Sequence, residues 1–342
     1  MQEKRLKISI LIPCHNEEKS IFRSVQSCLK QTRPADEVVV VNDGSTDKSL
    51  EILTSFGDAI KIVNLEKATG SKSYAQEYGL QFVTGDIFIA TDGDTLLGAN
   101  FVELMEADFQ NEEIAAVSGY VKSLKHNWLT ACRAFEYALG QNVHKLAQSY
   151  VNFMFVIPGA AGAFRTELFK ANIHFDHDTI TEDLDFTYKF HKLGLKLAYD
   201  RNAISYTQDP ATLPQYINQI RRWLGGGWQN LLKHFTVINE PVRALELSLI
   251  YIEGLVFSAL LLIMPFINWY YSVYFLGAYF VVIVALAVWA AIKERRLDIL
   301  WVIPAFPLVI FINAWIFLEQ FIKEIILGRK NLVWFHPDRV NL

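Results

Sequence analysis

Three acidic groups in the N-terminal part of the chain carry the side chains best suited to chemistry. Asp92 and Asp94 form an Asp-x-Asp turn, Asp43 stands in an Asn-Asp-Gly-Ser run, and Asp183 follows a glutamate. Carboxylate oxygens are the ligands that Mg²⁺ and Mn²⁺ prefer, and such an ion commonly bridges to phosphate oxygens. The Asp-x-Asp turn therefore indicates a divalent cation that binds a nucleotide diphosphate. The alternative is an ordinary turn, because aspartates are common in turns without any ligand.

A second group of polar side chains lies further along the chain, in the run Gln-Ile-Arg-Arg-Trp. Gln219, Arg222 and Trp223 offer an amide, a guanidinium and an indole close together on one predicted helix. An arginine can bind a diphosphate, and an indole can pack on a sugar face. The alternative is that this arginine and tryptophan only anchor an amphipathic helix at a membrane surface.

Apolar strands that alternate with helices are expected to position the acidic groups. Short β-branched runs and amphipathic segments predict strands and helices in alternation, at 8–13, 16–30, 37–41, 46–56, 60–65, 72–83 and 86–90. This order is typical of a parallel sheet with right-handed crossovers, in which ligands bind at the carboxyl ends of the strands. One edge of the sheet should therefore collect the residues that follow the strand ends: Asn16, Glu17, Asp43, Asp92 and Asp94.

The C-terminal part of the chain is apolar enough to enter a membrane. Hydrophobic residues make up 52% of the 342 residues and charged residues 20%, and the apolar excess lies beyond residue 245. The segments 245–266 and 269–292 are each long enough to span a bilayer. The basic run at 293–296 indicates that the loop after the second segment is cytosolic.

A third apolar segment, 299–318, contains two prolines and has basic residues on its distal side. A re-entrant or interfacial helix would keep those basic residues in the cytosol, whereas a full span would export them. We expect a full span here, and an amphipathic interface helix at about 212–235. The predicted organisation is a cytosolic domain at 1–235, a membrane region at 245–327 and a tail at 328–342.

Charge and cysteine content exclude several classes of protein. The net charge is −4, and no long basic run marks a nucleic-acid binder. The three cysteines form no CxxC pair, which favours reduced thiols over a disulfide scaffold. We expect no signal peptide before the first strand, and therefore an integral protein of the plasma (inner) membrane with its N-terminal domain in the cytosol.

The motifs together resemble those of the membrane-bound glycosyltransferases of family 2, such as cellulose, chitin, hyaluronan and poly-N-acetylglucosamine synthases. They follow that family's order over about residues 8–225: Ile-Pro-Cys-His-Asn-Glu at 12–17, Asn-Asp-Gly-Ser-Thr-Asp at 42–47, Lys72 after a glycine turn, Asp-Gly-Asp-Thr at 92–95, Gly-Ala-Ala-Gly-Ala-Phe-Arg at 159–165, Thr-Glu-Asp at 181–183 and Gln-x-x-Arg-Trp at 219–223. A short run at 334–339 is similar to the tail of the poly-N-acetylglucosamine synthases. The resemblance implies an α/β domain of the GT-A (nucleotide-diphospho-sugar transferase) type, followed by interface helices and an α-helical membrane region.

The resemblance also implies a role for each matching residue. Asp183 would be the general base, with Glu182 beside it, and Asp94 would bind Mg²⁺ or Mn²⁺. The nucleotide-sugar would be bound by Pro13, Asn16, Glu17, Asp43, Lys72 and Asp92. The diphosphate and the acceptor end would be held by Gln219, Arg222 and Trp223. One departure is Glu77, which stands where that family commonly carries asparagine.

The implied activity is an inverting transfer from a UDP-sugar that builds a β-linked polysaccharide. UDP-N-acetylglucosamine is the first expectation for the donor, and UDP-glucose the second. One alternative is the transfer of one or a few sugars to a lipid, such as a polyprenyl phosphate or diacylglycerol, and a remote one is a non-catalytic membrane partner. The expected partners are the UDP-sugar, a glycan or lipid acceptor and the bilayer, with a homo-oligomer or a secretion partner left open.

Overall fold

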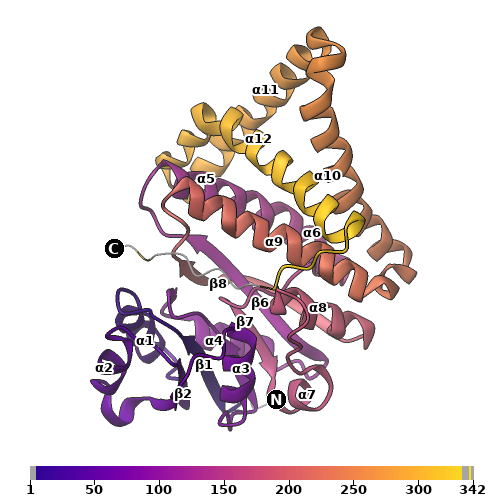
Figure 1. The fold of residues 1–342 in the computed structure, drawn as a ribbon. Helices are drawn as coiled ribbons and strands as arrows, with labels where there is room; N and C mark the ends of the chain where they lie inside the picture. The colour runs from indigo at the N-terminus through magenta and orange to yellow at the C-terminus, as the bar shows by residue number, and fades with distance from the viewer. Residues whose placement is uncertain (1–4, 333–338, 340–342) are drawn as a thin grey trace. The chain divides into compact units, whose positions relative to one another are not determined.

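The computed structural model describes residues 5–332 and Arg339, which form two compact units (Figure 1). Of the described residues, the first unit contains 5–122, 144–208 and Arg339, and the second contains 123–143 and 209–332. The helix within 123–143 and the predicted interface helix therefore group with the C-terminal apolar helices.

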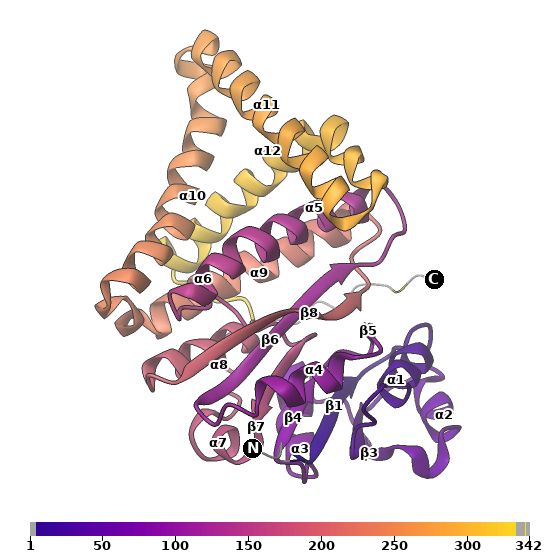
Figure 2. The same cartoon turned by 180° about the vertical axis from the view of Figure 1, so that it is seen from behind.

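The first unit is built on an eight-stranded sheet in the order β3-β2-β1-β4-β7-β6-β8-β5 (Figure 2). Its strands are β1 (Ile8–Cys14), β2 (Glu37–Asp43), β3 (Lys61–Leu65), β4 (Ile87–Ala90), β5 (Thr95–Leu97), β6 (Ile114–Ser123), β7 (Gly162–Arg165) and β8 (Lys196–Thr207). Strands β3, β2, β1 and β4 pair in parallel, as the alternation of strands and helices predicts. The sheet then continues with antiparallel pairs, β4 with β7, β7 with β6 and β8 with β5, which the sequence pattern did not indicate.

Helices connect and cover these strands. They are α1 (Ile21–Leu29), α2 (Ser49–Thr54), α3 (Lys72–Leu80), α4 (Phe101–Asp108), α6 (Leu146–Tyr150), α7 (Thr166–Leu168) and α8 (Glu182–Lys192). An aromatic core fixes α8 against the sheet: the ring of Phe164 on β7 lies 5.1 Å from that of Phe186 and 5.9 Å from that of Phe190. Because both phenylalanines belong to α8, this packing determines where the acidic first turn of the helix lies.

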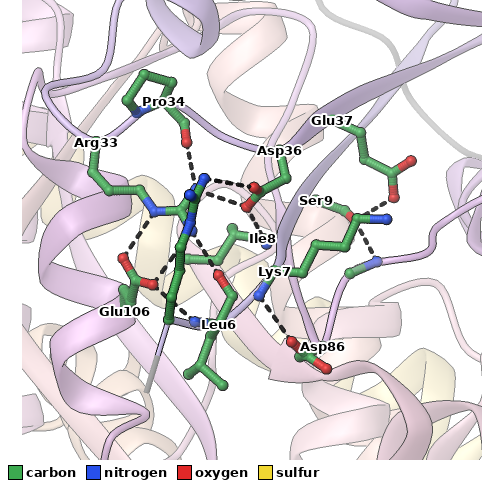
Figure 3. A network of polar contacts seen from close by, with 12 residues as sticks. Leu6, Lys7, Ile8, Ser9, Arg33, Pro34, Asp36, Glu37, Asp86 and Glu106 are labelled. Carbon is green, nitrogen blue, oxygen red and sulfur yellow. Dashed lines mark hydrogen bonds and ion pairs between the residues drawn. The ribbon is translucent and has the colours of Figure 1, made fainter. Parts of the chain in front are cut away.

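A polar network fixes the amino ends of the central strands, at the edge opposite their carboxyl ends (Figure 3). Arg33 donates to Glu106 over 2.8 Å, to Asp36 over 2.7 Å and to the carbonyl oxygen of Leu6 over 2.6 Å. Asp36 also accepts a 2.9 Å hydrogen bond from the backbone N–H of Ile8. Burial alone would raise the pKa of Asp36, but these hydrogen bonds and the charge of Arg33 lower it. The network therefore anchors β1 to the loop before β2.

The main helices that the structure describes in the second unit are α5 (Trp128–Leu139), α9 (Leu213–Lys233), α10 (Pro241–Ile267), α11 (Trp269–Glu294) and α12 (Val302–Phe321). Three helical stretches within the described part of the chain are long and apolar enough to cross a membrane: Pro241–Ile267, Trp269–Glu294 and Leu297–Ile326. Their shared apolar core includes Phe135 of α5, Ile220 of α9, Ile283 of α11 and Phe306 of α12. The two amphipathic helices are therefore packed onto the apolar helices.

Polar contacts join α12 to α9 along much of their length. The hydroxyl of Tyr216 lies 2.8 Å from Oδ1 of Asn313. Arg221 pairs with Glu319 over 2.9 Å. One residue of the π-helical turn that follows α12, Glu324, accepts a 3.1 Å hydrogen bond from Gln229. The C-terminal half of α12 thus lies against the polar face of α9.

We predict that replacing Asp108 with asparagine stabilises the protein at alkaline pH. Burial, and secondly the charge of Asp200, raise the pKa of Asp108 from 3.8 to about 7. The folded state therefore keeps a proton on Asp108 that the unfolded state loses near pH 4. As a result, the contribution of Asp108 to the free energy of unfolding falls as the pH rises from about 4 through 7. Thermal unfolding should show a melting temperature about 2 °C higher for the variant at pH 8, and no difference near pH 4. An equal gain in Asp58→Asn, at an exposed carboxylate on the same unit, would contradict this account.

Candidate active site

The carboxyl ends of β1, β2 and β4 lie at one edge of the sheet, because these strands are parallel neighbours. Pro13 is half-buried near the end of β1, and Asn16 and Glu17 follow that strand. Asp43 is the last residue of β2, and Asp92 follows β4. The predicted gathering of polar side chains at this edge is therefore confirmed at the level of the backbone.

Asp43 and Asn16 tie three loops of this edge together. The carboxylate of Asp43 accepts 2.8 Å hydrogen bonds from the backbone N–H and the hydroxyl of Thr69. Asn16, with a φ of 54°, accepts a 2.8 Å hydrogen bond from the N–H of Thr46. Gly44 has a φ of +57°, and a Cβ atom there would lie 2.2 Å from the backbone nitrogen of Ala68. The Asp-Gly pair is thus needed for the close approach of the loop that precedes α3.

Lys72, the first residue of α3, joins two of the predicted acidic groups. Its Nζ lies 2.6 Å from Asp92 Oδ1 and 3.1 Å from Glu182 Oε1, and 13% of its side chain is exposed. Burial alone would lower the pKa of Lys72, but the charges of the two carboxylates raise it well above its usual range. A Cβ atom at Gly159 would lie 2.7 Å from this Nζ, so a glycine there leaves room for the ammonium group. The site therefore keeps a permanent positive charge between β4 and α8.

Asp183 differs from the other carboxylates in the first turn of α8. Glu182 is buried against Lys72, and Asp185 is buried and pairs with Lys189 over 3.0 Å. Asp183 keeps an intermediate exposure, and its Oδ1 accepts a 2.9 Å hydrogen bond from the N–H of Leu184. Asp183 is therefore the carboxylate of this turn that a substrate can reach.

Lys145 is a buried charged residue that sequence reasoning missed. Its Nζ donates a 3.0 Å hydrogen bond to the hydroxyl of Ser118. Burial lowers the pKa of Lys145 to about 7, against the opposing effect of the negative charge of Asp183. A single lysine in a segment rich in aromatic residues forms no motif, so the sequence contained no signal for it.

Arg339 is a second residue that the sequence motifs did not assign to the site. Its guanidinium donates 2.6 Å and 2.9 Å hydrogen bonds to the carboxylate of Glu17 and pairs with Asp94 Oδ2 over 2.6 Å. Only 9% of the Arg339 side chain is exposed. The other residues of the tail run that resembles the poly-N-acetylglucosamine synthases, 334–338, lie outside the described residues.

The carboxylates of Glu17 and Asp94 fit a divalent cation. They converge from β1 and β4 on one cationic group, the guanidinium of Arg339, and both offer the hard oxygen ligands that Mg²⁺ and Mn²⁺ prefer. Burial raises the pKa of Asp94 to about 6, although the charge of Arg339 lowers it. A divalent cation bound by oxygen atoms of these two residues would neutralise the same two carboxylates.

Gln219, Arg222 and Trp223 belong to the second unit and share one face of α9, at positions i, i+3 and i+4. Gln219 is buried, and Arg222 and Trp223 are half-buried. The helix expected over about 212–235 corresponds to α9, which runs from Leu213 to Lys233. Its location at a membrane interface stays a prediction.

Known proteins similar to this chain include two curated relatives. A poly-beta-1,6-N-acetyl-D-glucosamine synthase of Staphylococcus epidermidis is 27% identical, over 98% of this chain and 88% of that protein. A synthase of the same name from Staphylococcus aureus is 26% identical, over 67% of this chain and 56% of that protein.

A solved structure has a similar fold. The mannosyltransferase PcManGT from Pyrobaculum calidifontis, in complex with GDP-Man and Mn²⁺, covers 94% of this chain and 87% of its own, with a TM-score of 0.61 and 19% identity. The fold is therefore the GT-A type that the sequence motifs imply. The sequence profile described as "Glycosyltransferase like family 2" matches residues 5–226, which is more than half of the chain. The chain therefore belongs to glycosyltransferase family 2.

Proposed function

We propose that this protein transfers N-acetylglucosamine from UDP-N-acetylglucosamine to a growing β-linked polysaccharide at a membrane. The family supports glycosyl transfer, and the names of the relatives support the sugar and the polymeric product. The observation that carries the proposal is the pairing of Lys72 with Asp92 and Glu182 beside the accessible Asp183. This arrangement places a fixed positive charge next to a carboxylate that can act as a base.

The chemistry of the proposed reaction is a single displacement at the anomeric carbon. The oxygen of the acceptor hydroxyl bonds to the anomeric carbon while Asp183 takes the proton of that hydroxyl. The bond between the anomeric carbon and the UDP oxygen breaks on the opposite face. The configuration inverts, so an α-linked donor gives a β-linkage. Lys72 fixes Glu182 by neutralising it, which leaves Asp183 as the acceptor of the proton.

The leaving UDP needs positive charge close to its phosphates. Asp94 and Glu17 would hold Mg²⁺ or Mn²⁺, whose chemistry here is to offset the charge of the diphosphate. Pro13, Asn16, Asp43 and Asp92 line the same edge of the sheet and would bind the rest of the nucleotide-sugar. In the second unit, Gln219 and Arg222 would bind the diphosphate, and Trp223 would pack on the acceptor sugar.

The donor preference can be tested in membranes that contain the protein. UDP release would be followed with UDP-N-acetylglucosamine, UDP-glucose and UDP-galactose, each with Mg²⁺, Mn²⁺ or a chelator. We expect the fastest release with UDP-N-acetylglucosamine and none with the chelator. Faster release with UDP-glucose, or release that persists in the chelator, would contradict the proposal.

We also propose that the chain crosses the membrane twice, with the catalytic unit in the cytosol. Arg339 contacts Glu17 and Asp94 within the first unit, so the chain must return after the apolar helices to the side on which it began. With an even number of crossings, one of the three apolar helices does not cross the membrane. Helix α12 is that helix, because its polar contacts with α9 suit an interface better than the bilayer core. Helix α12 would then be the re-entrant or interfacial helix that keeps the basic residues beyond it in the cytosol, and not the full span that we expect from the sequence.

Reporter fusions test this topology. A fluorescent protein after residue 342 should fluoresce in the cytosol, and alkaline phosphatase inserted after Asn268, between α10 and α11, should be active. Phosphatase activity from a fusion after residue 342 would show an odd number of crossings and overturn the assignment of α12.

A further inference from the structure

Arg133 of α5 is a fully buried cation in the second unit. Its side chain is 2% exposed and forms a short ion pair with Glu136, on the next turn of the same helix. Its Nε lies 3.4 Å from Oδ1 of Asp209, whose side chain is 1% exposed. A buried arginine is tolerated only with such partners, because an unpaired charge away from water is very costly.

Three aromatic rings surround the same guanidinium. The guanidinium carbon lies 4.5 Å from the ring centroid of Trp223, 4.9 Å from that of Tyr137 and 5.7 Å from that of Tyr216. All three distances are within the range of a cation–π contact, and tryptophan gives the strongest one. The closest of the three rings is thus the indole of the Gln-x-x-Arg-Trp motif.

The hydroxyls of the two tyrosines connect this cluster to its carboxylates. Tyr137 donates a 3.0 Å hydrogen bond to Asp209. The hydroxyl of Tyr216 lies 3.1 Å from Glu136 and, on the other side, 2.8 Å from Asn313 of α12. The guanidinium is therefore held by groups from α5, from α9 and from the segment before α9, and its freedom to move is small.

We propose that Arg133 is a positioning residue for Trp223: its buried guanidinium fixes the plane and position of the indole that packs on the acceptor sugar. This inference rests on the proposed function, in which Trp223 contacts the acceptor. A planar guanidinium can stack on an indole and bind two carboxylates at once. A lysine keeps the charge but offers neither the plane nor the fork of donors, so Arg133→Lys should loosen the indole while the buried charge stays compensated.

A double-mutant cycle separates this role from a merely structural one. The variants are Arg133→Lys, Trp223→Phe and the double variant, assayed with UDP-N-acetylglucosamine and a β-1,6-linked N-acetylglucosamine pentasaccharide as the soluble acceptor. Arg133→Lys should raise the acceptor KM about tenfold, which corresponds to about 1.4 kcal/mol, and leave the donor KM within about twofold. In the Trp223→Phe background, Arg133→Lys should change the acceptor KM by less than about twofold, because the indole that Arg133 positions is absent.

Arg296→Lys is the matched control. Arg296 lies in the same unit, pairs with Asp298 over 2.7 Å and contacts the carbonyl oxygen of Ser123, without a role in the proposed site. Its replacement should change the melting temperature and leave both KM values unchanged. If Arg133→Lys fails to fold, Tyr137→Phe provides the second test. It removes the hydroxyl that binds Asp209 but keeps the ring, and it should raise the acceptor KM about twofold.

The outcomes distinguish a failure of the positioning role from a failure of the proposed function. An active wild-type protein with equal effects of Arg133→Lys in both backgrounds, or with an effect on the melting temperature alone, would overturn the positioning role. For the Tyr137→Phe test, an unchanged acceptor KM in a folded variant would overturn it as well. A folded wild-type protein that releases no UDP with this donor, with or without the pentasaccharide, would instead contradict the proposed function.

Discussion

Replacing Asp183 with asparagine is expected to lower kcat for sugar transfer about a thousandfold, because an amide of the same shape cannot take the acceptor proton. The affinity for the UDP-sugar should stay within about twofold of the wild type, since the side chain faces the acceptor in the proposed reaction. Folding should be retained, because Asp183 is only half-buried and the aromatic core holds α8 in place. UDP release and equilibrium binding of UDP-N-acetylglucosamine would be measured on the same preparation.

Asp178→Asn is a suitable control for this experiment. Asp178 is an exposed carboxylate in the loop just before α8, so it shares the local charge but not the position of Asp183. Its replacement should change kcat less than about twofold. A kcat within tenfold of the wild type for Asp183→Asn would mean that another group takes the proton.

The second large effect is expected at Asp94. Replacement by asparagine removes one of the two carboxylates that converge on Arg339 and are proposed to bind the cation. We expect the affinity for UDP in the presence of Mn²⁺ to fall about a hundredfold, since losing a charged ligand costs several kcal/mol of metal affinity. The binding of UDP in a chelator should change much less, because the residues that are proposed to contact the nucleotide directly remain.

Calorimetric titration of UDP with and without Mn²⁺ measures the affinity for UDP. The electron paramagnetic resonance signal of free Mn²⁺ measures the affinity for the cation. Asp58→Asn, which removes an exposed charge from the same unit, controls for the change in net charge. If Asp94→Asn and the wild type bind Mn²⁺ equally, the cation is held elsewhere. The pairing of Asp94 with Arg339 would then be a structural ion pair.

The parallel half of the sheet could be predicted because buried parallel strands are short apolar runs with turn residues at each end. Strands β1, β2, β3 and β4 fall within about two residues of their predicted bounds. The first helix begins at Ile21 and not at Asn16 as predicted, because Asn16 and Glu17 bind the following loops instead: the N–H of Glu17 donates to the hydroxyl of Ser49 over 2.8 Å. Such side-chain and backbone contacts compete with helix formation and leave no periodic pattern. The antiparallel half of the sheet depends on pairing between strands distant in sequence, which periodicity does not encode.

Some contacts of the site could likewise be predicted from local sequence patterns, and others could not. Lys72 and Asp92 could be expected to meet because each stands at the end of a strand or the start of a helix at one sheet edge. The contacts of Arg339 with Glu17 join residues 322 positions apart, and no local pattern predicts them. Arg133 lies in a helix made mostly of apolar residues, and its carboxylate partner Asp209 is 76 positions away in the sequence. Long-range ion pairs of this kind are visible only once the fold is known.

The size and solubility of the product made from UDP-N-acetylglucosamine test the central claim most directly. Membranes with the protein would be incubated with the radiolabelled donor and Mg²⁺, extracted with organic solvent, and analysed by size-exclusion chromatography, with Asp183→Asn as the blank. The proposed function predicts a long polymer of N-acetylglucosamine that stays out of the organic phase and is absent from the blank. A short product that partitions with the lipids would contradict polymer synthesis and indicate transfer to a lipid acceptor.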